Sequence, residues 1–113
     1  MCSCTDQQEQ QIAQGEKLFH SVHIGKNNVI GCISCHTLKP DVTTVGPSLY
    51  ALNLRAGHLI TGLTAEQYIK QSIINPDAYI VSGYSPAVMF AHYQDELSDD
   101  EINAIIAYLM SLK

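Results

Sequence analysis

Residues 32–36 read Cys32-Ile33-Ser34-Cys35-His36, and this run decides what the rest of the 113-residue chain has to build. Two cysteines separated by two residues and followed directly by histidine fit the attachment signature of a c-type haem. The two thiols can add to the two vinyl groups of one haem, which brings the next imidazole beside the iron. The run therefore predicts one covalent haem c on Cys32 and Cys35, with His36 as the proximal iron ligand.

A zinc-binding module is the main alternative interpretation of the cysteines. Cys2 and Cys4 could join Cys32 and Cys35 as four thiolate ligands of a zinc ion. The Cys-x-Cys pair is unusually tight for zinc, and it lies at a chain terminus, where fraying is common. A thioredoxin-like redox pair would need a βαβ context, which the sequence lacks. Haem attachment is the interpretation that these arguments favour.

The composition limits the size of the fold and the class of partner. A chain of 12.4 kDa with 46% hydrophobic residues is one domain, yet it holds no Trp and only two Phe, so a buried cofactor would supply flat apolar volume to the core. The net charge is −5 with six Lys and Arg, which argues against nucleic acid, because phosphate binding needs clustered basic residues. No apolar run approaches the roughly 20 residues of a membrane span.

Helical spacing predicts an all-α, loop-rich chain in which no strand pattern is convincing. A first helix is expected from Thr5 to about Val22, with Thr5 or Asp6 as its N-cap. A short helix is expected from residue 47 or 48 to about residue 54, because proline suits a first helical turn.

Two capping boxes predict the starts of two further helices. Thr64-Ala-Glu-Gln67 begins a helix that ends at Asn75-Pro76, and Ser98-Asp-Asp-Glu101 begins a helix that runs to the C-terminus. The last helix carries an apolar stripe, formed by Ile102, Ile105, Ile106, Leu109 and Leu112. Residues 76–94 between the two helices are expected to form an ordered loop.

The sixth iron ligand would separate an electron carrier from a haem protein with an open site. Methionine sulfur opposite histidine raises the reduction potential into the range of carriers. Met1 is terminal, Met110 lies on the last helix beside the apolar stripe, and Met89 lies in the loop between two helices. Met89 is the expected ligand and His92 the main alternative. An open sixth position would instead indicate a sensor or an enzyme.

The ordered motifs of the chain resemble those of class I c-type cytochromes. From Gly15 onward they read GEKLF, CISCH, VGPSL, NPDAY, GYSPAVM and LSDDEINAIIAYL. The resemblance is closest to the cytochrome c domains of bacterial haem–copper oxidase subunit II and to single-haem cytochromes of bacterial respiratory complexes. It implies an all-α cytochrome c fold over residues 12–113, with crossing N- and C-terminal helices and loops wrapped around one haem. Residues 1–11 would form a flexible N-terminal tether.

The resemblance also implies roles for residues away from the attachment run. Gly15 and Phe19 would meet the C-terminal helix, with Tyr108 as the aromatic partner, since glycine lets two backbones approach closely. The carbonyl of Pro47 would accept a hydrogen bond from His36 and fix its ring.

Four further positions match residues around the haem in this family. Arg55 would bind a haem propionate, Tyr79 and Tyr84 would lie near the propionates and the methionine side, and Met89 would be the axial ligand. The family usually has proline directly after that methionine, whereas this chain has Phe90. The restraint that proline would place on the loop is therefore absent.

The resemblance implies a single-electron carrier, not an enzyme, that works between membrane complexes. A quinol-oxidising or photosynthetic complex would be the donor and a terminal oxidase the acceptor. Haem attachment takes place outside the cytoplasm, so we expect a protein of the periplasm or of the outer face of the cytoplasmic membrane, either a monomer or a subunit of a complex. Cys2 or Cys4, followed by a polar stretch, resembles the lipidated start of a lipoprotein, which would anchor the chain to a membrane.

Overall fold

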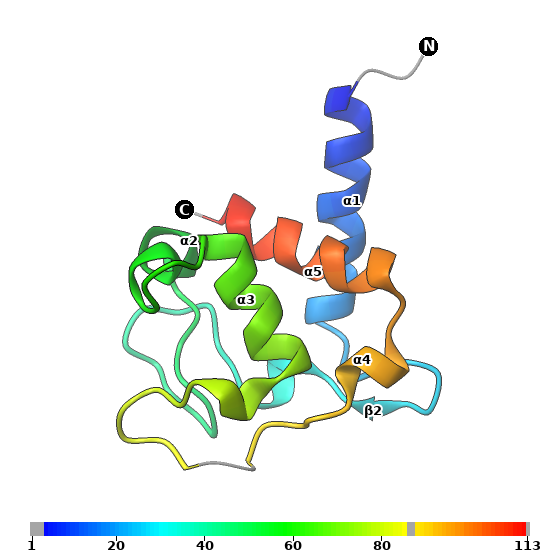
Figure 1. The fold of residues 1–113 in the computed structure, drawn as a ribbon. Coiled ribbons are helices and arrows are strands. Elements are labelled where there is room, and N and C mark those ends of the chain that lie inside the picture. The colour runs from blue at the N-terminus through cyan, green and yellow to red at the C-terminus, as the bar shows by residue number, and fades with distance from the viewer. Residues whose placement is uncertain (1–3, 86–87, 113) are drawn as a thin grey trace.

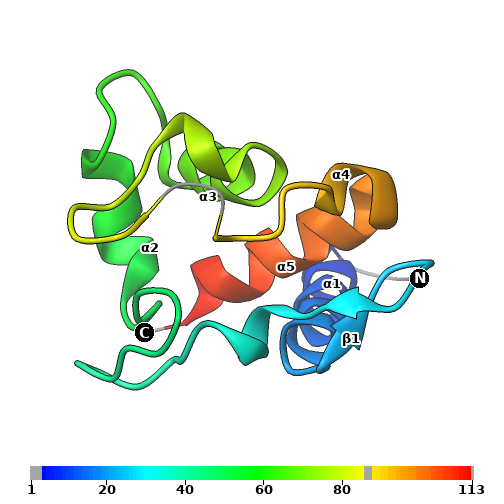
Figure 2. The same ribbon diagram turned by 90° about the horizontal axis from the view of Figure 1, so that it is seen from below.

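The computed structural model describes residues 4–85 and 88–112 and confirms the all-α prediction. Three helices form a frame: α1 (Cys4–Phe19), α3 (Ala65–Ile74) and α5 (Asp99–Ser111). Figure 1 shows α1 rising above the body of the molecule and α5 crossing the lower part of α1, with α3 in front and the loops below. The view from below in Figure 2 shows α5 passing between α1 on one side and α3 and the short helix α2 (Leu52–Arg55) on the other.

The crossing of α1 and α5 is the closest helix contact in the frame. A Cβ on Gly15 would lie only 1.9 Å from the carbonyl oxygen of Ala104, so the two backbones touch at this point. Phe19 is fully buried, and its ring centroid lies 5.8 Å from that of Tyr108. The hydroxyl of Tyr108 lies 3.0 Å from Nε2 of His20. The predicted contact of Gly15, Phe19 and Tyr108 is confirmed.

The bounds of α1 differ from the predicted ones. The helix begins at Cys4, so Thr5 and Asp6 lie within its first turn and the prediction that one of them is the N-cap was wrong. It ends at Phe19 and not near Val22, because the carbonyl of Val22 accepts a bond of 2.7 Å from the amide of Gly31 instead. The helix is regular over residues 4–11, the segment predicted as a tether, and the side chains of residues 6–11 are exposed. The domain boundary at residue 12 stays a prediction.

A small hairpin follows α1, although no strand was expected. Strands β1 (His23–Ile24) and β2 (Val29–Ile30) pair in antiparallel register, and each is too short to show an alternating sequence pattern. The carboxylate of Glu96 accepts hydrogen bonds from the amide (2.8 Å) and side chain (2.6 Å) of Asn27 in the turn. These bonds hold the pKa of Glu96 below its ordinary value and tie the hairpin to the helix that carries Glu96.

The segment after the hairpin contains less helix than predicted. The helix expected from residue 47 or 48 begins only at Leu52, as α2 (Leu52–Arg55), and continues as the 3₁₀ turn η2 (Ala56–His58). Ala51 has a left-handed backbone with φ of 54°, which interrupts any helix passing through it. Before it, the amide of Leu49 bonds to the carbonyl of Thr37 over 2.8 Å. This bond across the loop replaces the helical bonding that was expected at Leu49.

Both capping boxes form as predicted. In the first box, the hydroxyl of Thr64 accepts from the amide of Gln67, and the side chain of Gln67 accepts from the amide of Thr64. In the second box, Ser98 and Glu101 exchange the same two bonds. α3 ends before Asn75, in agreement with the Asn-Pro signal. In its described residues, the predicted loop over 76–94 contains the short turn η3 (Pro76–Ala78) and the start of α4 (Tyr93–Glu96), and the rest of residues 79–85 and 88–92 is irregular.

Candidate haem site

The attachment run folds into one tight turn, η1 (Cys32–Ser34). The carbonyl of Cys32 accepts from the amides of both Cys35 (3.1 Å) and His36 (3.0 Å), which holds the three residues in one turn. Both thiols are free and half-buried. Burial raises the pKa of the Cys32 thiol to about 11, so the thiol is neutral near pH 7.

The ring of His36 is fixed by its second nitrogen. Nδ1 lies 2.8 Å from the carbonyl oxygen of Pro47, which is the bond that the family resemblance implies. Because Nδ1 donates to that carbonyl, Nε2 is the nitrogen available to a metal. Burial lowers the pKa of His36, and the carbonyl of Pro47 offsets this only in part. The neutral ring that can bind iron is therefore favoured.

Gly46 forms a cradle for that ring, and sequence reasoning gave it no role. A Cβ at this position would lie 2.5 Å from Cε1 of His36. The amide of Gly46 also donates to the carbonyl of Cys35 over 2.8 Å, and the hydroxyl of Thr44 donates to the same oxygen over 2.6 Å. The Gly-Pro pair in VGPSL was the available signal, since a glycine beside a residue in the site allows close approach.

All eight predicted site residues line a single cavity of about 220 Å³. They are Cys32, Cys35, His36, Pro47, Arg55, Tyr79, Tyr84 and Met89. The other walls are largely apolar and come from Phe19 in α1 through Leu52, Tyr68 and Ile69 to Leu109 in α5. The lining therefore draws on residues from almost the full described length of the chain.

Arg55 and Tyr79 line the cavity and are also exposed at the surface. The guanidinium of Arg55 donates to the carbonyl oxygens of Tyr50 (2.9 Å) and Ser48 (3.2 Å), and its side chain is exposed. Tyr79 packs edge-on against Tyr68, with ring centroids 5.8 Å apart. Tyr68 is buried, which raises the pKa of its phenol, and it is a cavity residue that was not predicted from the sequence.

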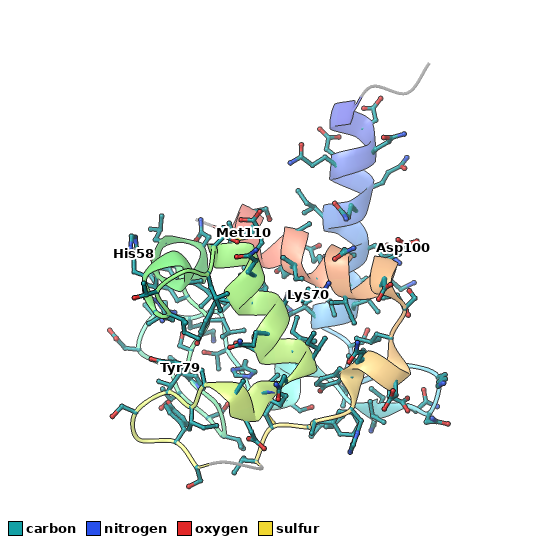
Figure 3. All side chains as sticks on the ribbon, viewed as in Figure 1. His58, Lys70, Tyr79, Asp100 and Met110 are labelled. Carbon is teal, nitrogen blue, oxygen red and sulfur yellow. The ribbon has the colours of Figure 1, made fainter. Side chains whose placement is uncertain are left out.

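The two candidates for a sixth ligand lie in different surroundings. Met89 is half-buried and lines the cavity. His92 lies outside the cavity lining, and its side chain is 73% exposed, with Nδ1 3.8 Å from a carboxylate oxygen of Asp95. Met110 lines a separate groove of about 490 Å³ between α1, α3 and α5, and Figure 3 places it on α5, far from Tyr79. Position therefore favours Met89.

The residues present fit a haem better than a zinc ion. Two thiols and an oriented imidazole converge on a cavity with apolar walls, which suits a flat, largely apolar ring with a central metal. Within residues 4–85 and 88–112, no three His, Cys, Asp or Glu side chains gather in a way that could hold a metal ion. Cys2 lies outside the described residues, as does the side chain of Cys4, so the alternative in which they join Cys32 and Cys35 around a zinc ion lies outside the described residues too.

Comparison with protein families gives the class of protein. The family model described as Cytochrome c matches residues 12–113, which defines a c-type haem protein. The chain belongs to the cytochrome c family. The search of the curated proteins gave no match, and neither did the search of the solved structures.

Membership of this family has three consequences for the chain. Its cofactor is a covalent haem c with iron, for which Cys32 and Cys35 have the required spacing. Its activity is that of a haem-based electron carrier, as is general in the family. Domains of the family typically work outside the cytoplasm, and no described helix combines the length and hydropathy of a bilayer span.

Proposed function

We propose that the chain carries single electrons with its iron held between His36 and Met89. Both side chains line the same cavity, and Met89 is the only methionine among residues 4–85 and 88–112 that does so. This observation carries the proposal, because a thioether sulfur as second axial ligand raises the reduction potential and closes the coordination sphere. A closed sphere favours outer-sphere electron transfer, with no substrate on the metal.

The chain's own residues would set the conditions for that transfer. The haem, when bound, supplies the iron that accepts and releases the electron. Pro47 holds the ring of His36 in one orientation and strengthens it as a donor. The apolar walls exclude water, and Arg55 offers a positive charge to a propionate.

The finer functional assignments follow from the resemblance and belong to the same proposal. We infer that the protein works in the periplasm, with a quinol-oxidising or photosynthetic complex as donor and a terminal oxidase as acceptor. The likeness to cytochrome c domains of oxidase subunit II supports the acceptor. Cys2 or Cys4 would carry a lipid anchor, and mass spectrometry of the intact protein tests that assignment.

The test of the ligation is a pair of methionine variants of the haem-loaded protein. Met89→Ala should abolish the weak sulfur-to-iron band near the red end of the ferric spectrum. Met110→Ala, which changes a methionine on the separate groove, should leave that band intact. Reduced Met89→Ala should also bind carbon monoxide rapidly, because its sixth position is open.

The results can contradict the proposal in two ways. Survival of the band in Met89→Ala would assign the sulfur to another methionine. Rapid binding of carbon monoxide by the unmodified reduced protein at neutral pH would show an open sixth position, as in a sensor or an enzyme.

A further inference from the structure

The segment that carries Met89 has little backbone support. Among the described residues, no backbone hydrogen bond involves residues 88–91; the nearest are Tyr84 to Val81 on one side and Asp95 to His92 on the other. The chain also lacks the proline that usually follows the axial methionine in the family. Side-chain packing has to hold this segment in place.

Phe90 supplies that packing. Its ring lies against Tyr93, with centroids 4.8 Å apart and planes at 62°, which is a favourable edge-to-face arrangement. Tyr93 is only 5% exposed, so it forms a firm base for the contact. Phe90 is half-buried and packs against the hydrophobic core together with Met89.

Tyr93 extends the contact to the segment that holds the cysteines. Its hydroxyl donates to the carbonyl oxygen of Ile30 over 2.5 Å. Ile30 ends the hairpin two residues before Cys32. A continuous path of contacts therefore runs from the residue next to Met89 to the residues that precede the attachment run.

We propose that Phe90 is a positioning residue for the sixth ligand: its ring, braced on Tyr93, holds the sulfur of Met89 in place as a proline would in related chains. This proposal rests on the proposed ligation by Met89. It predicts that loosening the ring contact lets Met89 leave the iron more often. An outside ligand would then compete more effectively for the sixth position.

The test uses imidazole as the competing ligand of the ferric, haem-loaded protein. In Phe90→Leu, which keeps apolar volume but removes the ring, the imidazole affinity should rise about two- to tenfold and the sulfur-to-iron band should weaken. Phe90→Tyr keeps the ring and should behave as the unmodified protein does. Tyr93→Phe keeps the ring contact and removes the bond to Ile30, so its imidazole affinity should rise less than that of Phe90→Leu.

A structural control separates positioning from general loosening. Tyr108→Leu removes a buried ring at the crossing of α1 and α5, away from the Met89 segment. It should lower the unfolding temperature and leave the imidazole affinity unchanged. An equal rise in Tyr108→Leu and Phe90→Leu would overturn the proposal.

The remaining outcomes assign failure to one proposal or the other. If the unmodified protein shows the sulfur-to-iron band and Phe90→Leu keeps its imidazole affinity, the role of Phe90 is wrong and the ligation stands. If the unmodified protein lacks the band, the ligation by Met89 fails, and the role of Phe90 fails with it. Should Phe90→Leu yield no haem-loaded protein, Tyr93→Leu, which removes the ring against which Phe90 packs, decides: an affinity equal to that of the unmodified protein overturns the proposal.

Discussion

Two glycines show how differently the helical frame and the loop wall of the cavity are built. Gly15 lets α1 and α5 touch, and the atom nearest to an added Cβ is a backbone carbonyl of Ala104. Gly46 makes room for a side chain, the imidazole of His36, and lies in a loop held by bonds between side chain and backbone. Crowding in the frame therefore acts on stability, whereas crowding in the loop wall acts on the metal site.

Gly15→Ala is the strongest way to break the frame. The new Cβ would overlap a backbone atom that cannot rotate away, so we expect a loss of about 3 kcal/mol or more in the free energy of unfolding. The gain in helix propensity, about 0.5–1 kcal/mol, does not offset it. Denaturant unfolding of the haem-loaded protein measures the loss.

Gly57→Ala is the matched control for that variant. Its nearest contact beyond its neighbours would be 3.7 Å away, so the change in stability should stay within about 0.5 kcal/mol. Equal losses of stability in Gly15→Ala and Gly57→Ala would show that the close approach of α1 and α5 does not depend on the absence of a side chain at Gly15.

Gly46→Ala sharpens the comparison from the other side. The methyl group would press on Cε1 of His36 and displace the ring from the carbonyl of Pro47. The free energy of unfolding should fall by about 1–3 kcal/mol. A weaker bond to Pro47 makes His36 a poorer donor, so the reduction potential should rise. Voltammetry measures the potential, and Gly15→Ala is expected to leave it unchanged while the protein remains folded. An unchanged reduction potential in Gly46→Ala would mean that the contact between Gly46 and the ring of His36 does not affect the potential.

Ser98→Ala tests a smaller term in the frame. It removes the hydroxyl that caps α5, which should cost about 1 kcal/mol and leave the haem spectrum intact. Ser111→Ala, at the other end of the same helix, loses only a bond to the carbonyl of Tyr108 and should change stability by less than about 0.5 kcal/mol. Thermal unfolding of the two variants compares these effects, and equal losses would argue against the cap.

Glu96→Gln should have the smallest effect, visible only as a pH dependence. Asn27 lowers the pKa of Glu96, so the ionised carboxylate stabilises the fold above its ordinary pKa of 4.5, and this contribution is lost as the pH falls through the lowered value. The unmodified protein should lose more stability than Glu96→Gln between about pH 7 and about pH 3. If the melting temperatures of the two proteins fall equally across that pH range, the bond to Asn27 does not stabilise the fold.

The same division between frame and loops explains what the sequence could predict. The two capping boxes were sufficient to predict the starts of α3 and α5, because each box is a signal contained within four consecutive residues. The prediction of a helix from residue 47 or 48 was wrong because Ala51 has a left-handed backbone and the amide of Leu49 bonds to the carbonyl of Thr37. Both features depend on segments that are far apart in the sequence. Local periodicity contains no such information.

The candidate site divides in a similar way. The spacing of Cys32, Cys35 and His36 is a local signal, and it was sufficient to predict the cofactor. The contributions of Gly46 and Tyr93 arise from contacts with His36 and Ile30, which the adjacent sequence does not specify; the Gly-Pro pair in VGPSL indicates only that a close approach is possible at Gly46. Met89 lies between these cases: its segment is recognisable, but its bond to iron stays a prediction.

The cavity lining, which runs from the first helix to the last, bears on how the protein matures. Without its pigment the polypeptide would lack the contacts that the apolar cavity walls, to which Phe19, Leu52 and Leu109 contribute, would make with the ring. We expect the newly exported chain to stay loose until both thioether bonds are made and then to collapse around the ring. Loading would thus serve as a checkpoint: coloured chains would resist proteases, and colourless ones would be degraded.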